Sequence, residues 1–540
     1  MYRLTSLVLL ASSLGFPALA RDDAPAIRVD PRLLAQSEEV WKHIAREDNR
    51  VWPGWDASDT PRLFYRPGEQ DVLIGHPAPP AGFLEYRGDL PWTGAPIFVR
   101  DDVTFFDMDG QNTARPIEGV ETLVVADTLS NLRQRVGGLL HDPRPAADKV
   151  ETLKLSDLNL DAYEQMAMIA HEAFHVYQNR RAPNRGADES ALRFYPTLSV
   201  VNNVGFALES DLLLEALSAD SEAAVRDAAL RWLAVRAHRR TSLPSSAIPY
   251  EDEVEFSEGL AKFVELKLFE TLEGSTPSDA LWWSQEFRGF DDLSWLRDRR
   301  LDDLRRNLTG EQVVNNDRYG TAPLRFRLYY SGMGIAALLD ALGTSWREDI
   351  FRTQISLTDL VHRELAASDE VLKAALERAW SGARADSLIA EKRNLAEDGE
   401  AEFKARLASI LQSDATVLVI DYSALPDETV GLGYTPFGLT RLDDDRTIYT
   451  MVPVSVALPG GFGLQQTRPS PLLHDRAAKT LTFALSEKLG SAEAASAFGG
   501  ELGEDAVPIG IRKLPGVTLK LGKGHVSLDG RRLRIVLSKP

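Results

Sequence analysis

The feature that most constrains the fold of this chain is its hydrophobic periodicity, which changes twice along the sequence. Between about 156 and 413, apolar side chains recur at the three- and four-residue spacings that are typical of helices. On either side of this region, short apolar runs are bounded by Pro and Gly, which indicates strands. The sequence therefore predicts an α+β protein with a helical centre and a β-rich part at each end.

These changes of pattern predict three folded parts after an N-terminal leader. Residues 21–155 are expected to be mainly β with a short helix near 31–46, residues 156–413 to be helical, and residues 414–540 to form a small, mostly β domain. The predicted strand segments are 61–75, 95–106, 119–125, 415–422, 446–458, 479–485 and 532–537. The predicted helical segments of the centre are 161–180, 206–240, 251–271, 322–343, 357–380 and 384–412.

Residues 1–20 have the pattern of a secretory signal peptide. Arg3 precedes an apolar run over 7–16, and the segment ends in the small-residue pattern of residues 18–20. The apolar run is about half of the roughly 20 residues that span a bilayer, so cleavage after Ala20 is favoured over anchoring. We therefore expect an exported bacterial protein, periplasmic or secreted, with no stable membrane anchor once the signal peptide is removed.

Composition excludes several classes of function. The 540 residues include no cysteine, which excludes a thiolate zinc site, an iron–sulfur cluster and a cysteine nucleophile, so any metal must be bound by His, Asp or Glu. The 80 acidic residues outnumber the 61 basic ones, and the net charge of -19 repels the phosphates of nucleic acids. The short basic cluster of Arg236, Arg239 and Arg240 is predicted to be the solvated end of a helix, and nucleic acid is not an expected partner.

The segment 161–180 carries the most informative motif and is predicted to be a helix. Asp161 and Glu164 have the spacing of an N-terminal capping box, and Pro183 and Gly186 lie just past the expected end. Apolar and small side chains follow the helical period around the motif, which predicts a largely buried helix. These side chains are Met166, Ile169, Ala170, Ala173, Phe174 and Tyr177.

Within this helix, His171, Glu172 and His175 form the pattern H-E-x-x-H. The four-residue spacing places the two histidines on one face, one turn apart, so both imidazoles can bind a single metal ion. Glu172 lies about 100° round the helix from His171, where it can act as a general base toward water rather than as a ligand. The sequence therefore predicts a zinc site, because burial of these polar groups without a metal would cost several kcal/mol.

A catalytic zinc site usually has three protein ligands, so a third must come from elsewhere in the chain. The extended motif with a third histidine is excluded, because Gln178 and Arg181 occupy the positions of its Gly and His. A carboxylate from a second helix is the remaining common solution. Glu258 is followed by Gly259 and Ala261, small residues that permit a close approach to the histidine helix. Other downstream carboxylates stay open as candidates: Glu189, Glu209, Glu215, Glu222, Glu251, Glu253, Glu255 and Glu265.

The segments 171–178 and 257–265 together resemble the paired helices of the gluzincin metallopeptidases, in which an H-E-x-x-H helix is joined by a helix with an N-E-G-x-A-x-[FY]-like motif. The resemblance implies that His171, His175 and Glu258 bind Zn²⁺ and that Glu172 is the general base. It also implies that 156–413 is the zinc-binding catalytic domain and that 21–155 forms one wall of the cleft, with an edge strand that pairs with an extended peptide.

The chain departs from the gluzincin pattern at two places. Many gluzincins carry an Asp four residues after the ligand Glu, where this chain has Lys262; Glu255 and Glu265 are candidates for the role of that Asp, or else are solvated charges. The interval between the two motifs is also long, which predicts a helical insertion at about 190–250. By the same resemblance, Tyr330, with Tyr329 as the alternative, is a candidate donor to the oxyanion of the transition state.

The function predicted from these features is that of an exported zinc metallopeptidase acting on a peptide or protein substrate. Two alternatives stay open. One is a non-catalytic envelope or binding protein that keeps a gluzincin-like metal site as a scaffold, and the other is a metal-dependent hydrolase of a non-peptide amide. The sequence does not predict the oligomeric state.

Overall fold

A computed structural model shows a mixed α+β protein with helices at its centre and β-sheets in its N- and C-terminal parts, as the periodicity predicts. The predicted signal peptide lies outside the described residues. The described part of the chain contains no helix that is both long enough and apolar enough to span a membrane. The structure describes residues 26–88, 94–140, 158–314, 317–352, 355–425, 430–433, 438–450, 454–458, 461–468, 470–498, 510–521 and 524–538.

The chain divides into two compact units, and each is built from separate stretches of sequence. Unit 1 contains 1–185, 257–302 and 346–355. Unit 2 contains 186–256, 303–345 and 356–540. The predicted domain boundaries near 155 and 413 stay predictions.

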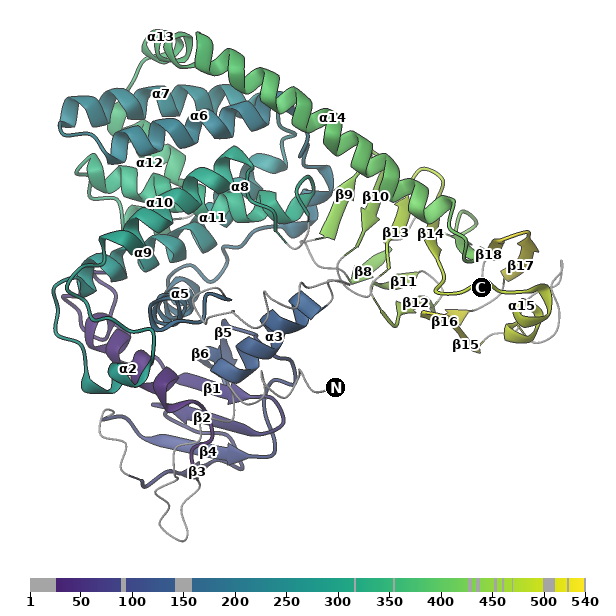
Figure 1. Cartoon of the computed structure of the whole chain (residues 1–540), viewed down its shortest axis with the longest axis horizontal. Coiled ribbons are helices and arrows are strands. Elements are labelled where there is room, and N and C mark those ends of the chain that lie inside the picture. The colour runs from purple at the N-terminus through teal and green to yellow at the C-terminus, as the bar shows by residue number, and fades with distance from the viewer. Residues whose placement is uncertain are drawn as a thin grey trace. The chain divides into compact units, whose positions relative to one another are not determined.

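Unit 1 contains a six-stranded sheet with the order β3-β4-β2-β1-β6-β5 (Figure 1). Its only parallel pair among the described strands is β1 with β6, and β5 is joined to β6 by a two-residue turn. Glu118 and Gly119 in this turn both have positive φ, at 47° and 79°, which suits a tight hairpin. The strands are β1 (Arg62–Arg66), β2 (Gln70–Ile74), β3 (Leu84–Glu85), β4 (Ile97–Asp101), β5 (Thr113–Ile117) and β6 (Val120–Ala126).

Helices cover this sheet and form the remainder of the unit 1 core. The helix α5 (Ala162–Arg181) packs against β5 and β6 on one side and against α2 (Pro31–Ile44) and α9 (Leu260–Leu272) on others. The helix α3 (Thr128–Leu140) follows β6, and α10 (Ser294–Thr309) was not predicted from the sequence. The helix α2 confirms the helix that the sequence predicts near 31–46.

A cluster of aromatic side chains holds α5 and α9 together. The ring of Trp52, which is fully buried, lies 4.7 Å from Phe174 of α5, 6.3 Å from Phe263 of α9 and 5.3 Å from Trp346. The ring of Trp55 also lies close to Phe174, with the two ring centroids 5.3 Å apart. Large buried aromatic rings contribute much of the packing energy of a core, so this cluster fixes the distance between the two helices.

Unit 2 begins with a helical region in which α6 and α7 form an antiparallel hairpin (Figure 1). The sequence predicts one helix over 206–240, but the chain breaks at Ser218, and the side chain of Ser221 caps the start of α7. The predicted helix 357–380 is likewise two helices, separated at Ala366, whose φ is 46°. The elements of this region are η2 (Glu189–Phe194), α6 (Val200–Leu217), α7 (Glu222–Arg240), α8 (Ala247–Val254), α11 (Thr321–Ala341), α12 (Leu357–Leu365), α13 (Asp369–Trp380) and α14 (Ala383–Leu411).

The basic cluster on α7 is buried, so the prediction that it is a solvated helix end is wrong. Arg236 and Arg239 are fully buried, and both donate to Glu209 of α6, at 2.9 and 2.6 Å. Arg239 and Arg240 also bind Glu251 of α8 at 2.7 and 3.1 Å. The arginines neutralise carboxylates from neighbouring helices, and these arginine pairs hold the pKa of Glu251 well below its ordinary value against the opposing effect of burial.

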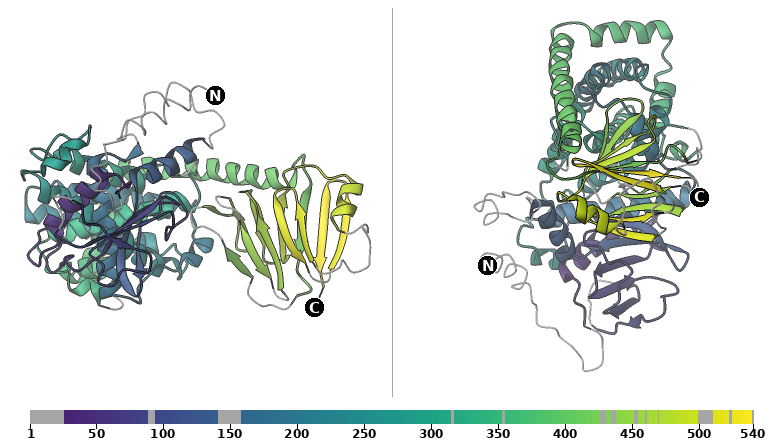
Figure 2. Two further views of the ribbon diagram at one scale, coloured as in Figure 1. Left: turned by 90° about the horizontal axis from the view of Figure 1, so that it is seen from below. Right: turned by 90° about the vertical axis from the view of Figure 1, so that its right-hand side faces the viewer.

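The C-terminal part of unit 2 consists of two sheets, which Figure 2 shows as two layers. A seven-stranded sheet has the order β17-β18-β7-β14-β13-β10-β9, and a five-stranded sheet has the order β15-β16-β12-β11-β8. The helix α14 lies along the first sheet and packs on β13 and β14 (Figure 1). The strands are β7 (Val417–Asp421), β8 (Gly431–Gly433), β9 (Leu439–Arg441), β10 (Arg446–Tyr449), β11 (Ser455–Leu458), β12 (Phe462–Gln466), β13 (Leu472–Asp475), β14 (Thr480–Ala484), β15 (Gly510–Leu514), β16 (Val517–Leu521), β17 (Gly524–Asp529) and β18 (Arg532–Leu537), and the short helix α15 (Ser491–Ala497) lies between β14 and β15.

The substitution Arg239→Leu should destabilise unit 2 by about 3–5 kcal/mol, because it leaves the buried carboxylates of Glu209 and Glu251 without a major partner. The matched control is Arg231→Leu on the same helix, whose partners Glu215 and Asp227 are exposed, and it should cost less than about 1 kcal/mol. Urea unfolding of both variants measures the difference. Equal losses of stability would contradict the role of the buried pairs.

A buried histidine in β13 makes the stability of the C-terminal sheets depend on pH. Burial, together with the charges of Arg476 and Arg193, lowers the pKa of His474 to about 4. Its Nε2 atom lies 2.7 Å from the hydroxyl of Tyr422, which donates to the neutral imidazole. The unfolded chain, with an ordinary histidine pKa of about 6.5, binds more protons than the folded chain between pH 6.5 and 4.

Stability should therefore be complete above pH 6.5 and fall by up to about 3 kcal/mol as the pH drops through 6.5 toward 4. His474→Gln keeps an acceptor for Tyr422 and should remove this part of the pH dependence. The exposed His362→Gln is the control and should leave it unchanged. Thermal melts at several pH values measure the effect, and parallel profiles for wild type and His474→Gln would rule it out.

Candidate metal centre

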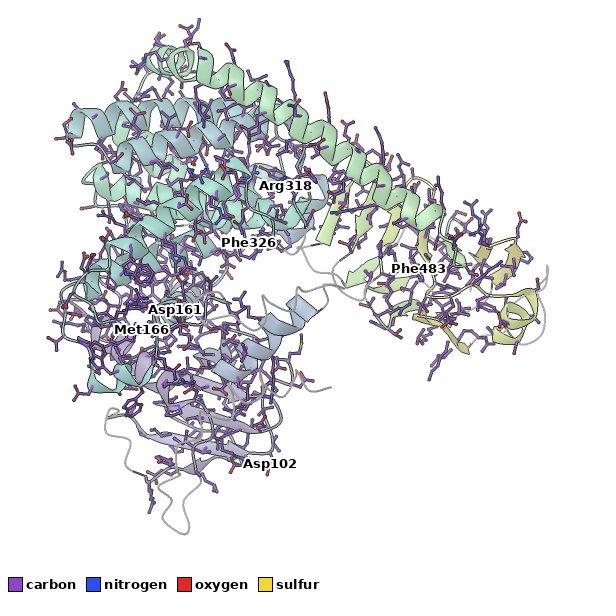
Figure 3. All side chains as sticks on the ribbon, in the orientation of Figure 1. Asp102, Asp161, Met166, Arg318, Phe326 and Phe483 are labelled. Carbon is purple, nitrogen blue, oxygen red and sulfur yellow. The ribbon has the colours of Figure 1, made fainter. Side chains whose placement is uncertain are left out.

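The helix α5 begins as predicted, but only half of the expected capping box forms. The side chain of Asp161 accepts hydrogen bonds from the backbone N–H groups of Tyr163 and Glu164, at 2.9 and 3.1 Å. The carboxylate of Glu164 turns instead to Arg300, which donates to it at 2.7 and 3.1 Å. Figure 3 labels Asp161 and Met166 at the start of this helix. The ion pair between Glu164 and Arg300 therefore links α5 to α10.

His171 and His175 of α5 meet Glu258 in unit 1, as the sequence predicts. The Nε2 atoms of His171 and His175 lie 3.4 and 3.6 Å from the same oxygen, Oε2 of Glu258. Their ring centroids are 4.8 Å apart and the rings are nearly perpendicular, at 84°. One donor atom from each of the three side chains lies within 4.8 Å of the other two, which is a group able to bind a metal ion.

Glu258 lies in a short π-helical segment, η3 (Glu255–Gly259), which joins α8 to α9. A π turn is rare and usually short, and it is often found where a functional side chain is presented. The small residues that follow, Gly259 and Ala261, agree with the predicted close packing of this helix on α5. The prediction of one helix over 251–271 therefore holds in its extent but missed the π turn at Glu258.

Both histidines are oriented by a hydrogen bond from their second ring nitrogen. The Nδ1 atom of His171 lies 2.8 Å from Oε1 of Glu265, and the Nδ1 atom of His175 lies 2.9 Å from Oε1 of Gln178. A carboxylate and an amide oxygen accept here, so each Nδ1 donates and each Nε2 is left to face Glu258. Of the two predicted candidates for this orienting role, Glu265 fills it.

Neither Glu255 nor Glu265 is a solvated charge. Glu265 is buried and also accepts from Lys262 at 2.8 Å and from Arg300 at 3.1 Å. Lys262 stands where many gluzincins carry an Asp, and here it neutralises the carboxylate that orients His171. Glu255 belongs to the buried network of unit 2, where it binds Arg236 and accepts from Ser331 at 2.6 Å.

The carboxylates determine the charge of the imidazoles in the absence of metal. Burial alone would lower the pKa of His171, but its hydrogen bonds to Glu258 and Glu265 raise it to about 9. Burial likewise opposes ionisation of Glu258, but the hydrogen bonds from His171 and His175 outweigh it and hold the pKa of Glu258 well below its ordinary value. The cluster is thus a negatively charged ligand set that either protons or a cation can neutralise.

Glu172 differs from the three clustered side chains in its bonding. Its carboxylate accepts no hydrogen bond from the described residues, and its pKa is raised by burial, an effect that the neighbouring His175 and His171 partly offset. The carboxylate oxygens are therefore available to a water molecule beside the ligand set. This arrangement agrees with a base rather than a ligand.

Tyr330 and Tyr329 lie on α11, in unit 2. The hydroxyl of Tyr330 lies 3.4 Å from Oδ2 of Asp303, and the ring of Tyr329 packs 5.1 Å from Phe326. Their proposed contact with a transition state stays a prediction.

Sequence reasoning missed three residues that support the site: Gln178, Lys262 as a partner of Glu265, and Arg300. A signal existed for Gln178, because it lies three residues after His175 on the same helix and so on a neighbouring face. Arg300 had no such signal, since the fold alone brings it to α5 and α9.

Comparisons with models of protein families, with curated proteins and with solved structures find no match to this chain.

The substitution Glu265→Gln should weaken zinc binding by about 10–100-fold, because an amide is a poorer acceptor for His171 than a carboxylate held by two cations. Competition with a chromophoric chelator measures the affinity. Glu270→Gln, on the exposed side of the same helix, is the matched control and should bind zinc like wild type. Wild-type affinity in Glu265→Gln would show that the hydrogen bond does not tune the site.

Proposed function

We propose that this protein is an exported zinc-dependent metallopeptidase of the gluzincin type. The observation that carries the proposal is the convergence of His171, His175 and Glu258 beside the Glu172 carboxylate, which accepts no hydrogen bond from the described residues. A purely structural metal site has no use for a carboxylate in that position. Glu172 therefore favours catalysis over the alternative of a metal-stabilised scaffold.

The ligand set fits zinc in its chemistry, and the two separations that join the histidines to Glu258 fit it in spacing. Two imidazole nitrogens and one carboxylate oxygen form a common ligand set of catalytic zinc sites, which keep the fourth position open. Two donor atoms bound to a tetrahedral zinc at about 2.0–2.1 Å lie about 3.3 Å apart. The observed separations of 3.4 and 3.6 Å between the Nε2 atoms and Glu258 are close to that value.

Zinc bound by these residues would supply a Lewis acid that polarises a peptide carbonyl and makes a nearby water more acidic. Glu172 accepts the proton of the attacking water and then donates it to the nitrogen of the leaving amine. Glu265 and Gln178 keep the Nε2 atoms of the two histidines directed toward the ligand cluster.

The sheet of unit 1 offers a place for an extended peptide. Among the described strands, β5 pairs with β6 alone and so lies at an edge of the sheet, and it packs beside α5, which carries the histidines. An exposed edge binds an extended peptide through backbone hydrogen bonds, which depend little on the peptide sequence. Pro116 removes one donor from this edge, so the strand does not offer a continuous ladder to a second copy of itself. This edge supports a peptide or protein as the substrate.

The decisive experiment compares wild type with Glu172→Gln in zinc stoichiometry and in cleavage of a peptide library. Glu172→Gln should retain zinc, because Glu172 is not a ligand, and lose at least about 100-fold in kcat/KM, because it loses the general base. Glu222→Gln, at an exposed position on α7, is the control and should cleave like wild type. Unchanged cleavage by Glu172→Gln would contradict the mechanism.

The same experiment separates the alternatives. Zinc binding by wild type without cleavage of any peptide or other amide would favour the non-catalytic scaffold. Zinc binding with cleavage of non-peptide amides alone would favour the amide hydrolase. A wild type without zinc would contradict the assignment of the site. Tight, stoichiometric zinc binding by Glu258→Ala would assign the third ligand to another carboxylate.

A further inference from the structure

Three tryptophan side chains of unit 1 are exposed to solvent, and none of them belongs to the candidate metal centre. Trp282 and Trp283 end a short 3-10 helix, η4 (Asp279–Trp283), and Trp295 lies in the first turn of α10. Their side chains are 56%, 40% and 44% exposed. Exposure of a large apolar ring to water is unfavourable, so three such rings in one short stretch of chain indicate a surface that binds a ligand.

Buried aromatic rings connect Trp282 with Trp295. The centroid of the Trp282 ring lies 5.0 Å from that of Phe287. Phe287 stacks 5.4 Å from Tyr163, and Tyr163 lies 5.5 Å from Trp295. The hydroxyl of Tyr163 donates to the carbonyl oxygen of Gly289 at 2.8 Å, which fixes the middle of this row. The two exposed indoles are therefore separated by only two rings, close enough for a single ligand to contact both.

The helix η4 is held at both ends by α2, so its indoles have a fixed position. At its start, the backbone N–H of Ser278 donates to the buried carboxylate of Glu39 at 3.1 Å. Just past its end, Oγ of Ser284 accepts from the amide of Gln36 at 3.3 Å. The fully buried side chain of Leu281 anchors the middle. A surface whose rings are already in place loses little conformational entropy when it binds a ligand.

The apolar exposure of this part of unit 1 is confined to the indoles. The structure describes all of 257–302, and no aliphatic or phenylalanine side chain in that range is exposed. Another surface of unit 1, by contrast, exposes Leu84, Val103 and Met108. A protein partner or a membrane is bound through a continuous apolar surface to which aliphatic side chains contribute. The tryptophans have no such surround within 257–302.

Carboxylates stand beside the indoles instead. In a 3-10 helix, residues three apart eclipse one another, so the exposed Asp279 shares a face with Trp282. In α10, Asp298 follows Trp295 by three residues and is its neighbour on the helix surface. The side chain of Asp298 is 70% exposed. Each end of the row thus offers an apolar ring next to a strong hydrogen-bond acceptor.

This pairing of ring and carboxylate is complementary to a sugar. A pyranose ring has a face of C–H groups, which packs on an indole, and a rim of hydroxyl groups, which donate to carboxylates. The exposed charged side chains around the tryptophans are mostly acidic, which disfavours sulfated or uronic acid sugars and anionic lipids. These side chains are Asp279, Arg288, Asp291, Asp292, Arg297 and Asp298.

We propose that Trp282, Trp283 and Trp295 form a binding site for a neutral saccharide chain. Sugar rings stack on Trp282 and Trp295, and their hydroxyl groups donate to Asp279 and Asp298. The site is separate from the proposed peptidase chemistry, because it needs neither the metal nor Glu172.

The direct test is binding of the full-length wild-type protein to an array of neutral, sulfated and uronic acid oligosaccharides of equal length, followed by calorimetric titration with the best neutral chain. At least one neutral chain should bind, and the acidic chains should bind more weakly. Binding of no neutral chain, or a preference for acidic ones, would overturn the proposal. The measurement involves no cleavage, so its result stands whether or not the protein is a peptidase.

Variants test whether the indoles carry the binding. Trp282→Ala and Trp295→Ala should each weaken binding of the neutral chain by about 10-fold or more, and Trp282→Phe, which keeps a ring, should weaken it less. The control Met108→Ala removes another exposed apolar side chain of unit 1 and should bind like wild type. Thermal unfolding checks that each variant is folded, as expected for exposed positions. Wild-type affinity in either alanine variant would overturn the proposal, as would binding to phosphatidylcholine vesicles in place of the glycan.

Discussion

The candidate metal centre depends on the packing of α5 against α9 in unit 1. This contact brings together the buried His171 and Glu265 with the partly buried His175 and Glu258, and unpaired charges among them would be costly. Each charged side chain has a partner of opposite charge. The histidines pair with Glu258, His171 also pairs with Glu265, and Glu265 pairs in turn with Lys262 and Arg300. The aromatic cluster around Trp52 sets the helix spacing on which all these distances depend.

In unit 2, buried charges are neutralised by ion pairs between helices. Arg236, Arg239 and Glu209 are fully buried but are arranged as alternating charges shared among α6, α7 and α8. Such a network adds directional contacts between these helices.

Much of the fold and of the site follows from local patterns in the sequence. Periodicity predicts α5, α11 and α14 nearly to their ends. The spacing of His171 and His175 predicts that both imidazoles can reach one metal position. Local pattern does not predict the partners that tertiary structure brings from far along the chain. Arg236 and Arg239 have the sequence appearance of a solvated helix end because their carboxylates lie on other helices, and Glu164 is diverted from its cap by Arg300.

The π-helical segment Glu255–Gly259 bears on how such a site can arise in evolution. A π turn contains one residue more than the α turn it replaces, and one added residue rotates the following part of a helix by about 100°. Deletion of a single codon here would restore a regular turn and change the rotational position of Glu258 on its own helix. The carboxylate of the candidate metal cluster can thus be gained or lost in one genetic event, while both histidines of α5 stay unchanged.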